Sequence, residues 1–173
     1  DQFRRQFWAA ARAGQIKAEL QKAGVPDVKG VWLMVSGGSR LVIVVSIKQR
    51  YPGHAKQAAV VASQCHAGAY LGRYVIVVDD DIDPSNTDDV IWAMSSRSDP
   101  DTDIDIIRRC WSGPLDPIIQ PGKKGFNSRA IIDACRPFEW MKDFPPVAES
   151  SKEVLDATAK KWGKVLFSSN GKG

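Results

Sequence analysis

Residues 73–83 read RYVIVVDDDID, an apolar, β-branched run followed at once by acidic residues. The run from Arg73 to Val78 has the length and composition of a fully buried strand, and Asp79 to Asp81 end it. A strand that is buried on both faces needs a covering layer on each side, which favours an α/β fold.

Strands and helices alternate on both sides of this run. Val28–Val35 and Arg40–Lys48 are rich in Val, Ile and Leu and flank a Ser-Gly-Gly-Ser turn, which predicts a β-hairpin. Helices are expected at 3–23, at 54–70, at 87–97 with Thr87 or Asp88 as the cap, and from Ser150 or Ser151 to about Gly163. A strand is expected at 104–110, and residues 128–134 could form either a helix or a strand. The pattern predicts an α/β fold: a mixed β-sheet covered by helices, with an opening β-hairpin followed by βαβ-type units.

The bulk composition argues against several classes of protein. The 173 residues suit one compact domain, and the net charge of +4 is spread along the chain without the basic run of a nucleic-acid-binding protein. No apolar stretch of about 20 residues is present, so we expect no membrane span. Cys65, Cys110 and Cys135 form no CxxC motif, and we interpret them as free thiols of a cytoplasmic protein.

The acidic run at the carboxyl end of the strand has two interpretations. Ligands bind at this edge of open α/β sheets, and clustered carboxylates can share a divalent cation. Asp79 to Asp83 would then serve a metal-dependent glycosyltransferase or phosphotransferase. In the other interpretation, the same side chains cap the following turn and helix and pair with Arg or Lys.

Two further segments carry groups suited to binding. Lys48 to Lys56 is a basic turn that leads into a helix N-terminus, where an anion could bind; His54 within it favours a local hydrogen bond over a role as general base. Arg108 to Pro117 is a restricted loop after a strand, which forms either a pocket wall or an ordinary buried connection. Cys110 has no His or Asn partner at a recognisable spacing, so a thiol nucleophile is weakly supported.

Several segments together resemble the C-terminal domain of UbiD-type decarboxylases. The similar segments, in matching order and spacing, are Ser46–Lys56 (SIKQRYPGHAK), which resembles the opening of that domain's first crossover helix, then Val75–Asp83, Asp88–Ala93 and Ser96–Pro100. The resemblance covers about Ile16 to Pro117 and, less closely, Ser128 to Pro137.

The resemblance implies a reaction and its cofactors. The family catalyses reversible, non-oxidative decarboxylation of aromatic, heteroaromatic or α,β-unsaturated acids with prenylated FMN, a divalent metal that is usually Mn²⁺, and K⁺. Its catalytic residues and metal ligands belong to a preceding flavin-binding domain, and no segment here matches them. We therefore expect no catalytic residue in this chain and no activity from it alone. A hydroxybenzoate-like acid is the expected substrate.

Individual positions take expected roles from the same resemblance. Gly113, Pro114 and Leu115 match the family's loop that meets the substrate beside the flavin, and Leu71 falls where another pocket-lining side chain is expected. Arg97 matches an arginine associated with the potassium site. Some members place a basic residue near the flavin where Ala67 stands here, so His66 becomes the candidate cofactor contact. The run Asp79 to Asp83 is then structural or interfacial.

The resemblance also divides the chain into parts. Residues 1–24 are expected to lead in from the flavin-binding domain, 25–167 to form the oligomerisation and substrate-pocket domain, and 168–173 to be a flexible tail. The expected partners are further copies of the chain, as a homodimer or homohexamer, the flavin-binding domain and an aromatic acid. A non-enzymatic assembly module is a third alternative.

Overall fold

A computed structural model of the chain describes residues 2–123, 125–148 and 150–166. The chain divides into two units, Asp1–Lys142 and Asp143–Gly173. The first helix and the sheet belong to the same unit, and the expected division of roles after residues 24 and 167 stays a prediction. The expected tail, 168–173, lies outside the described residues.

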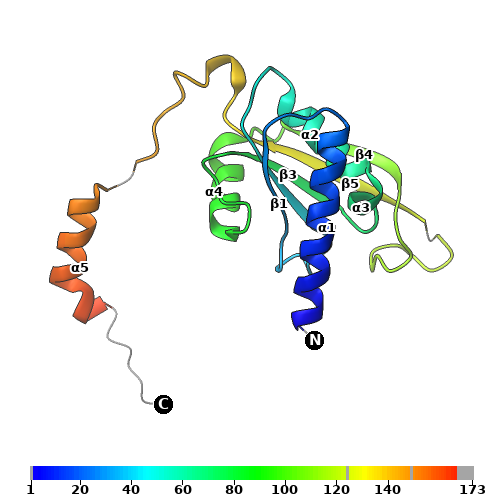
Figure 1. Ribbon diagram of the computed structural model, residues 1–173, viewed down its shortest axis with the longest axis horizontal. Coiled ribbons are helices and arrows are strands. Elements are labelled where there is room, and N and C mark those ends of the chain that lie inside the picture. The colour runs from blue at the N-terminus through cyan, green and yellow to red at the C-terminus, as the bar shows by residue number, and fades with distance from the viewer. Residues whose placement is uncertain (1, 124, 149, 167–173) are drawn as a thin grey trace, which may run out of the picture. The chain divides into compact units, whose positions relative to one another are not determined.

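The first unit is built on a five-stranded mixed sheet with the strand order β1-β2-β3-β5-β4 (Figure 1). The strands are β1 (Val28–Leu33), β2 (Val42–Ile47), β3 (Tyr74–Asp79), β4 (Ile104–Trp111) and β5 (Phe126–Ala134). β1 pairs antiparallel with β2, β3 pairs parallel with both β2 and β5, and β4 closes the edge antiparallel to β5. The expected hairpin followed by βαβ units is confirmed.

Helices cover the two faces of the sheet unequally. α1 (Gln2–Lys22) and α2 (His54–Gln64) pack on one face, where Ile16 and Leu20 join Val75 and Val77 in a core. α4 (Thr87–Arg97) packs on the other face, where Val90 joins Ile76 and Val78. Successive residues of β3 thus enter opposite cores, as a strand buried on both faces requires.

Three local expectations need correction or completion. The helix expected over 54–70 is interrupted at Cys65, whose ψ of 150° is not helical, so α2 ends there and the short α3 (His66–Ala69) follows. In this arrangement Gly68 lies so close to Ala62 that a Cβ at Gly68 would overlap the carbonyl oxygen of Ala62. The cap of α4 is neither Thr87 nor Asp88: Asn86 accepts hydrogen bonds from the backbone amides of residues 88 and 89. Residues 128–134, left open, belong to strand β5.

The second unit contains α5 (Lys152–Leu166). The Ser151 hydroxyl accepts a hydrogen bond from the Val154 amide at 3.4 Å, which confirms Ser151 as the start of this helix. The helix continues past Gly163, so the expected end was three residues early. None of the described helices has the length and apolar character needed to cross a membrane.

Candidate functional site: a pocket wall and a charged network

The structure brings together two segments that are distant in the sequence. Leu71 lies shortly before β3, which begins at Tyr74, and Gly113 to Leu115 lie shortly after β4, which ends at Trp111. β4 runs antiparallel to β5, and β5 runs parallel to β3. The last residues of β4 and the first residues of β3 therefore lie at the same end of the strands. Gly113 lies against Tyr70, where a Cβ would be 2.5 Å from the ring atom Cε2. Only glycine permits this approach.

The backbone at Leu71 is in an unfavourable conformation. Its φ is 119°, a region that side chains with a Cβ rarely adopt, and its side chain is 2% exposed. Such a conformation costs about 1–3 kcal/mol and is concentrated at ligand-binding sites. Pro114 and Leu115 are exposed, with Leu115 at 64%. The structure thus places Leu71 beneath the surface and the 114–115 tip on it, and the pocket-lining role of all these residues stays a prediction.

Arg129 joins the segments that carry this wall. It is buried in β5, and its guanidinium donates hydrogen bonds to the carbonyls of Ser63, Ala69 (2.7 Å) and Trp111, near the ends of α2, α3 and β4. Burial lowers the pKa of Arg129. Sequence reasoning missed this residue, because its three carbonyl partners come from segments that only the fold brings together.

The 112–117 loop has a second anchor in Asp116. This carboxylate is fully buried and accepts hydrogen bonds from the Ile118 amide (3.2 Å) and from Asn127 Nδ2 (3.1 Å), while Arg73 Nε stands 3.6 Å away. Buried atoms without a hydrogen-bond partner among the described residues gather here: Arg73 Nε, Ser112 Oγ, Asn127 Oδ1 and Arg129 Nε. Unsatisfied buried polar groups are costly, which makes this loop one of the less stable parts of the described unit.

Aromatic and cationic side chains cover one side of the wall. The exposed His66 ring stacks on Trp111 with centroids 5.1 Å apart, and Tyr70 lies 6.1 Å from the same indole. Arg12 of α1 lies over Tyr70 and donates to the Ala67 carbonyl at 2.7 Å. His66 and Ala67 therefore sit beside the wall, and contact between His66 and a flavin stays a prediction.

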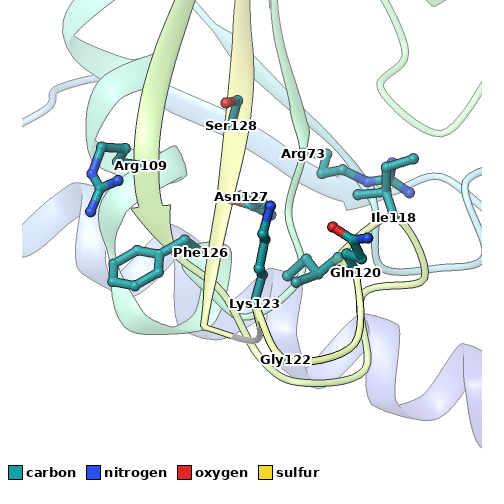
Figure 2. Close-up of a pocket in the computed structure, with 10 residues that line it drawn as sticks. Arg73, Arg109, Ile118, Gln120, Gly122, Lys123, Phe126, Asn127 and Ser128 are labelled. Carbon is teal, nitrogen blue, oxygen red and sulfur yellow. The ribbon is translucent and has the colours of Figure 1, made fainter.

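A cavity of about 690 Å³ opens next to the loop (Figure 2). Its lining comes from the end of β4, the start of β5, the segment between them, and Arg73 before β3. The lining residues are Arg73, Arg109, Ile118, Ile119, Gln120, Gly122, Lys123, Phe126, Asn127 and Ser128.

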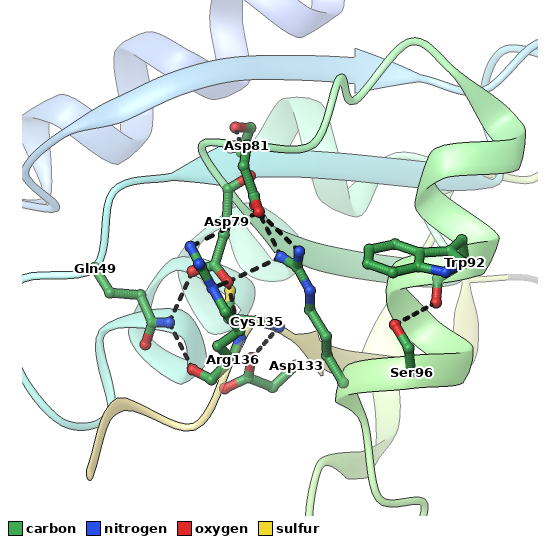
Figure 3. A network of polar contacts seen from close by, with 10 residues as sticks. Gln49, Asp79, Asp81, Trp92, Ser96, Asp133, Cys135 and Arg136 are labelled. Atoms are coloured by element: carbon green, nitrogen blue, oxygen red, sulfur yellow. Dashed lines mark hydrogen bonds and ion pairs between the residues drawn. The ribbon is translucent and has the colours of Figure 1, made fainter. Parts of the chain in front are cut away.

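The acidic run lies at the opposite end of the strands, where Asp79 and Asp81 pair with arginines (Figure 3). Buried Asp79 accepts hydrogen bonds from Gln49 (2.8 Å), Arg97 (3.1 Å) and both the backbone and Nε of Arg136 (2.8 and 3.0 Å). Asp81 takes two 2.8 Å hydrogen bonds from the Arg97 guanidinium, which hold the pKa of that carboxyl below its usual value.

This network supports the structural interpretation of the acidic run. Asp83 accepts hydrogen bonds from the amide and hydroxyl of Ser85, and the described residues contain no group of His, Cys, Asp and Glu placed to hold a metal ion. The glycosyltransferase or phosphotransferase alternative is therefore not favoured. Arg97 is buried between Asp79 and Asp81 and stacks on Trp92 at 5.1 Å, while its association with a potassium site stays a prediction. His54 is buried and makes the expected local hydrogen bond, from the Arg50 amide to Nδ1.

Comparison with known proteins agrees with this geometry. The family profile described as 3-octaprenyl-4-hydroxybenzoate carboxy-lyase C-terminal domain matches residues 5–134. A phenolic acid decarboxylase of Sedimentibacter hydroxybenzoicus is 37% identical over 116 residues, 67% of this chain and 23% of that protein.

Solved structures give the same result. The UbiD-class enzyme HmfF from Pelotomaculum thermopropionicum, in complex with FMN, superposes with a TM-score of 0.72 at 26% identity, over 84% of this chain and 32% of that one. The closed form of the Sedimentibacter hydroxybenzoicus vanillic acid decarboxylase gives 0.67 at 30% identity, over 88% and 32%. The chain spans about a quarter to a third of the length of these proteins. Its sequence and fold place it in the UbiD decarboxylase family, where it corresponds to the C-terminal domain.

Proposed function

We propose that this chain is the C-terminal domain of a reversible, non-oxidative decarboxylase that acts on an aromatic or α,β-unsaturated carboxylic acid, with a hydroxybenzoate-like acid as the substrate. In this proposal a flavin-binding domain carries the chemistry. The present chain closes one wall of the substrate pocket with Leu71, Gly113, Pro114 and Leu115 and holds copies of the enzyme together.

One observation carries the proposal: the two predicted wall segments meet and are held in place together. Gly113 lies against Tyr70, next to Leu71, and Arg129 bonds to carbonyls on both sides of this contact. The buried guanidinium of Arg129 and the buried carboxylate of Asp116 fix the wall before a ligand binds. Binding therefore costs less conformational entropy than it would with a mobile loop. The exposed Leu115 would exclude water from the ring of the substrate.

The cofactors of the proposal are prenylated FMN, Mn²⁺ and K⁺. Bound prenylated flavin would supply the electron sink for loss of carbon dioxide. A flavin is supported by the FMN in the similar HmfF structure. Since the described residues offer no carboxylate or imidazole cluster for a divalent ion, we assign the Mn²⁺ ligands to the flavin-binding domain. His66, exposed beside the wall, is the proposed contact of this chain with the flavin, and Arg97 is proposed to order the segment near K⁺ through its bonds to Asp79 and Asp81.

Self-association and a reducing compartment complete the proposal. A solved HmfF structure is an evolved dimeric form, which supports assembly through related chains. The cysteines at positions 65, 110 and 135 are free thiols, as is usual in the cytoplasm.

The wall is tested in an enzyme that combines this chain with its flavin-binding domain, by carbon dioxide release from 4-hydroxybenzoate and related acids. Leu115→Ala should lower kcat/KM by about 10- to 100-fold, because a side chain that packs on the substrate is lost. Val35→Ala, an exposed apolar residue in the β1–β2 turn, should leave kcat/KM unchanged. Unchanged kcat/KM in Leu115→Ala, or carbon dioxide release by this chain without the flavin-binding domain, would contradict the proposal.

A further inference from the structure

His54 is a titratable side chain that is buried inside the first unit. It begins α2, and none of its surface is exposed to solvent. Its Nδ1 accepts a hydrogen bond from the backbone amide of Arg50 (3.3 Å), and its ring centroid lies 4.6 Å from that of Tyr51. An imidazole that accepts a hydrogen bond at Nδ1 is neutral and carries its proton on Nε2. The fold therefore selects one protonation state and one tautomer of His54.

The surroundings of the His54 ring oppose its protonation. Burial lowers the pKa of His54, and this effect outweighs the Pro26 carbonyl and the Asp27 carboxylate, which raise it. The Arg50 guanidinium also lowers this pKa. Asp27 is already paired with Arg50 and Lys29, so it offers little free negative charge to a second cation. The position of His54 at the N-terminus of α2 adds to the effect, because the helix dipole disfavours positive charge there.

Protonation of His54 would disrupt residues 48–53, which connect β2 to α2. A protonated imidazole carries an N–H donor at both nitrogens, so the Arg50 amide would face a second donor in place of its acceptor. The same connection contains Gln49, whose amide nitrogen donates hydrogen bonds to the Asp79 carboxylate and to the Arg136 carbonyl, each at 2.8 Å. A movement of the connection would therefore reach the charged network at the carboxyl end of β3 (Figure 3).

We propose that His54 is an acid-sensitive latch on the 48–53 connection. The neutral ring holds the connection closed, and protonation releases it together with the bonds of Gln49 to Asp79 and Arg136. Because the folded pKa of His54 lies below the unfolded value of about 6.5, the neutral ring stabilises the fold above that pH. This stability is lost as the pH falls from the unfolded towards the folded pKa. The latch requires neither flavin nor substrate, so it stands apart from the proposed function.

The test follows the imidazole nitrogens of the ¹⁵N-labelled chain by NMR as the pH is lowered from about 8 to about 4.5. His54 should show the Nε2–H tautomer at neutral pH and should titrate with a midpoint below about 6.5. The backbone amide signal of Arg50 and the side-chain amide signal of Gln49 should shift with the same midpoint. The chain has two histidines, so His66→Asn leaves one and assigns the imidazole signal.

Two variants separate the latch from other titrations. His54→Asn keeps a side-chain acceptor and removes the titrating ring, so the Arg50 and Gln49 signals should no longer respond over this pH range. Asp133→Asn is the matched control, because burial raises the pKa of Asp133, which lies in β5 near Arg136 and could act on Gln49 instead. The control should leave the response of both signals unchanged.

The latch is overturned if the midpoint of His54 lies at or above about 6.5, or if the Arg50 and Gln49 signals do not follow it. It is also overturned if acid unfolds the whole chain before these signals move, or if Asp133→Asn abolishes the response. If His54→Asn does not fold, the titration of the wild type and of Asp133→Asn decides the matter.

Discussion

Asp79 and Asp81 share Arg97, but they differ in burial and should differ in what they contribute to stability. Asp79 is buried and binds both Arg97 and Arg136, so Asp79→Asn removes the buried negative charge that these two arginines share and leaves Arg97 with Asp81 alone. We expect it to lower the free energy of unfolding by about 3 kcal/mol. The Asp81 side chain is 40% exposed, and solvent screening reduces the loss expected for Asp81→Asn to about 1 kcal/mol or less. Urea denaturation of both variants measures the difference, and equal losses would contradict the assignment of Asp79 as the centre of the network.

The Asp81 contribution should also depend on pH. The hydrogen bonds from Arg97 lower the pKa of Asp81 in the folded protein, so the carboxylate stabilises the fold above the unfolded pKa of about 4. That stability is lost as the pH falls through the lower, folded pKa. Asp81→Asn should therefore be less stable than the wild type near pH 7 and indistinguishable from it in strong acid. A stability gap that persists unchanged in strong acid would show that charge is not its source.

The same residues decide between the structural and metal-binding interpretations of the acidic run. With Asp79 and Asp81 paired to arginines and Asp83 bonded to Ser85, Mn²⁺ would have to displace existing partners. We expect millimolar MnCl₂ to leave the melting temperature of the chain unchanged, with MgCl₂ at the same ionic strength as the control. A rise specific to Mn²⁺ and absent in Asp81→Ala would restore the metal-dependent transferase alternative.

At the scale of elements, the predictable features were those that depend on local pattern. The continuous β-branched run from Arg73 to Val78 predicted β3, and the Ser36–Ser39 turn predicted the β1–β2 hairpin. The break at Cys65 was not predicted, since residues 54–70 have a continuous helical composition and the close packing of Gly68 against Ala62 is visible only in the fold. Arg129 was missed for a similar reason: its three carbonyl partners come from segments brought together only by the fold.

Two glycines in helices test this distinction. Gly68→Ala should lower the free energy of unfolding by about 3 kcal/mol, because its Cβ would overlap the backbone of Ala62. Gly14→Ala should raise it by roughly 0.5–1 kcal/mol, because Gly14 is exposed inside α1 with nothing within 4 Å of its Cβ position. Thermal unfolding followed by circular dichroism measures both. A Gly68→Ala variant as stable as the wild type would contradict the close approach of Gly68 to Ala62, and a destabilised Gly14→Ala would contradict the open space at Gly14.

At the scale of the first unit, one face of the sheet is only partly covered. α4 is the helix that packs on this face among the described elements, and beside it an apolar groove of about 250 Å³ is lined largely by Met34, Val42, Tyr74, Ile76, Ile91, Met94 and Ile132. Tyr74 and Ile91 are 47% and 49% exposed. Apolar patches of this kind commonly mark interaction sites. In the proposed self-association, a second copy of the chain would cover this groove with its own apolar surface.

Light scattering at several protein concentrations tests this assembly. We expect a dimer or larger species whose mass does not change with MnCl₂, because the metal ligands are assigned to the flavin-binding domain. Ile91→Glu places a charge in the groove and should shift the mass towards the monomer, since an unpaired charge is costly to bury at an interface. Val60→Glu, at an exposed apolar position on α2 away from the groove, is the control and should leave the mass unchanged. A wild-type chain that is monomeric at every concentration would contradict self-association by this domain, whereas an Ile91→Glu variant that remains dimeric would place the interface on another surface.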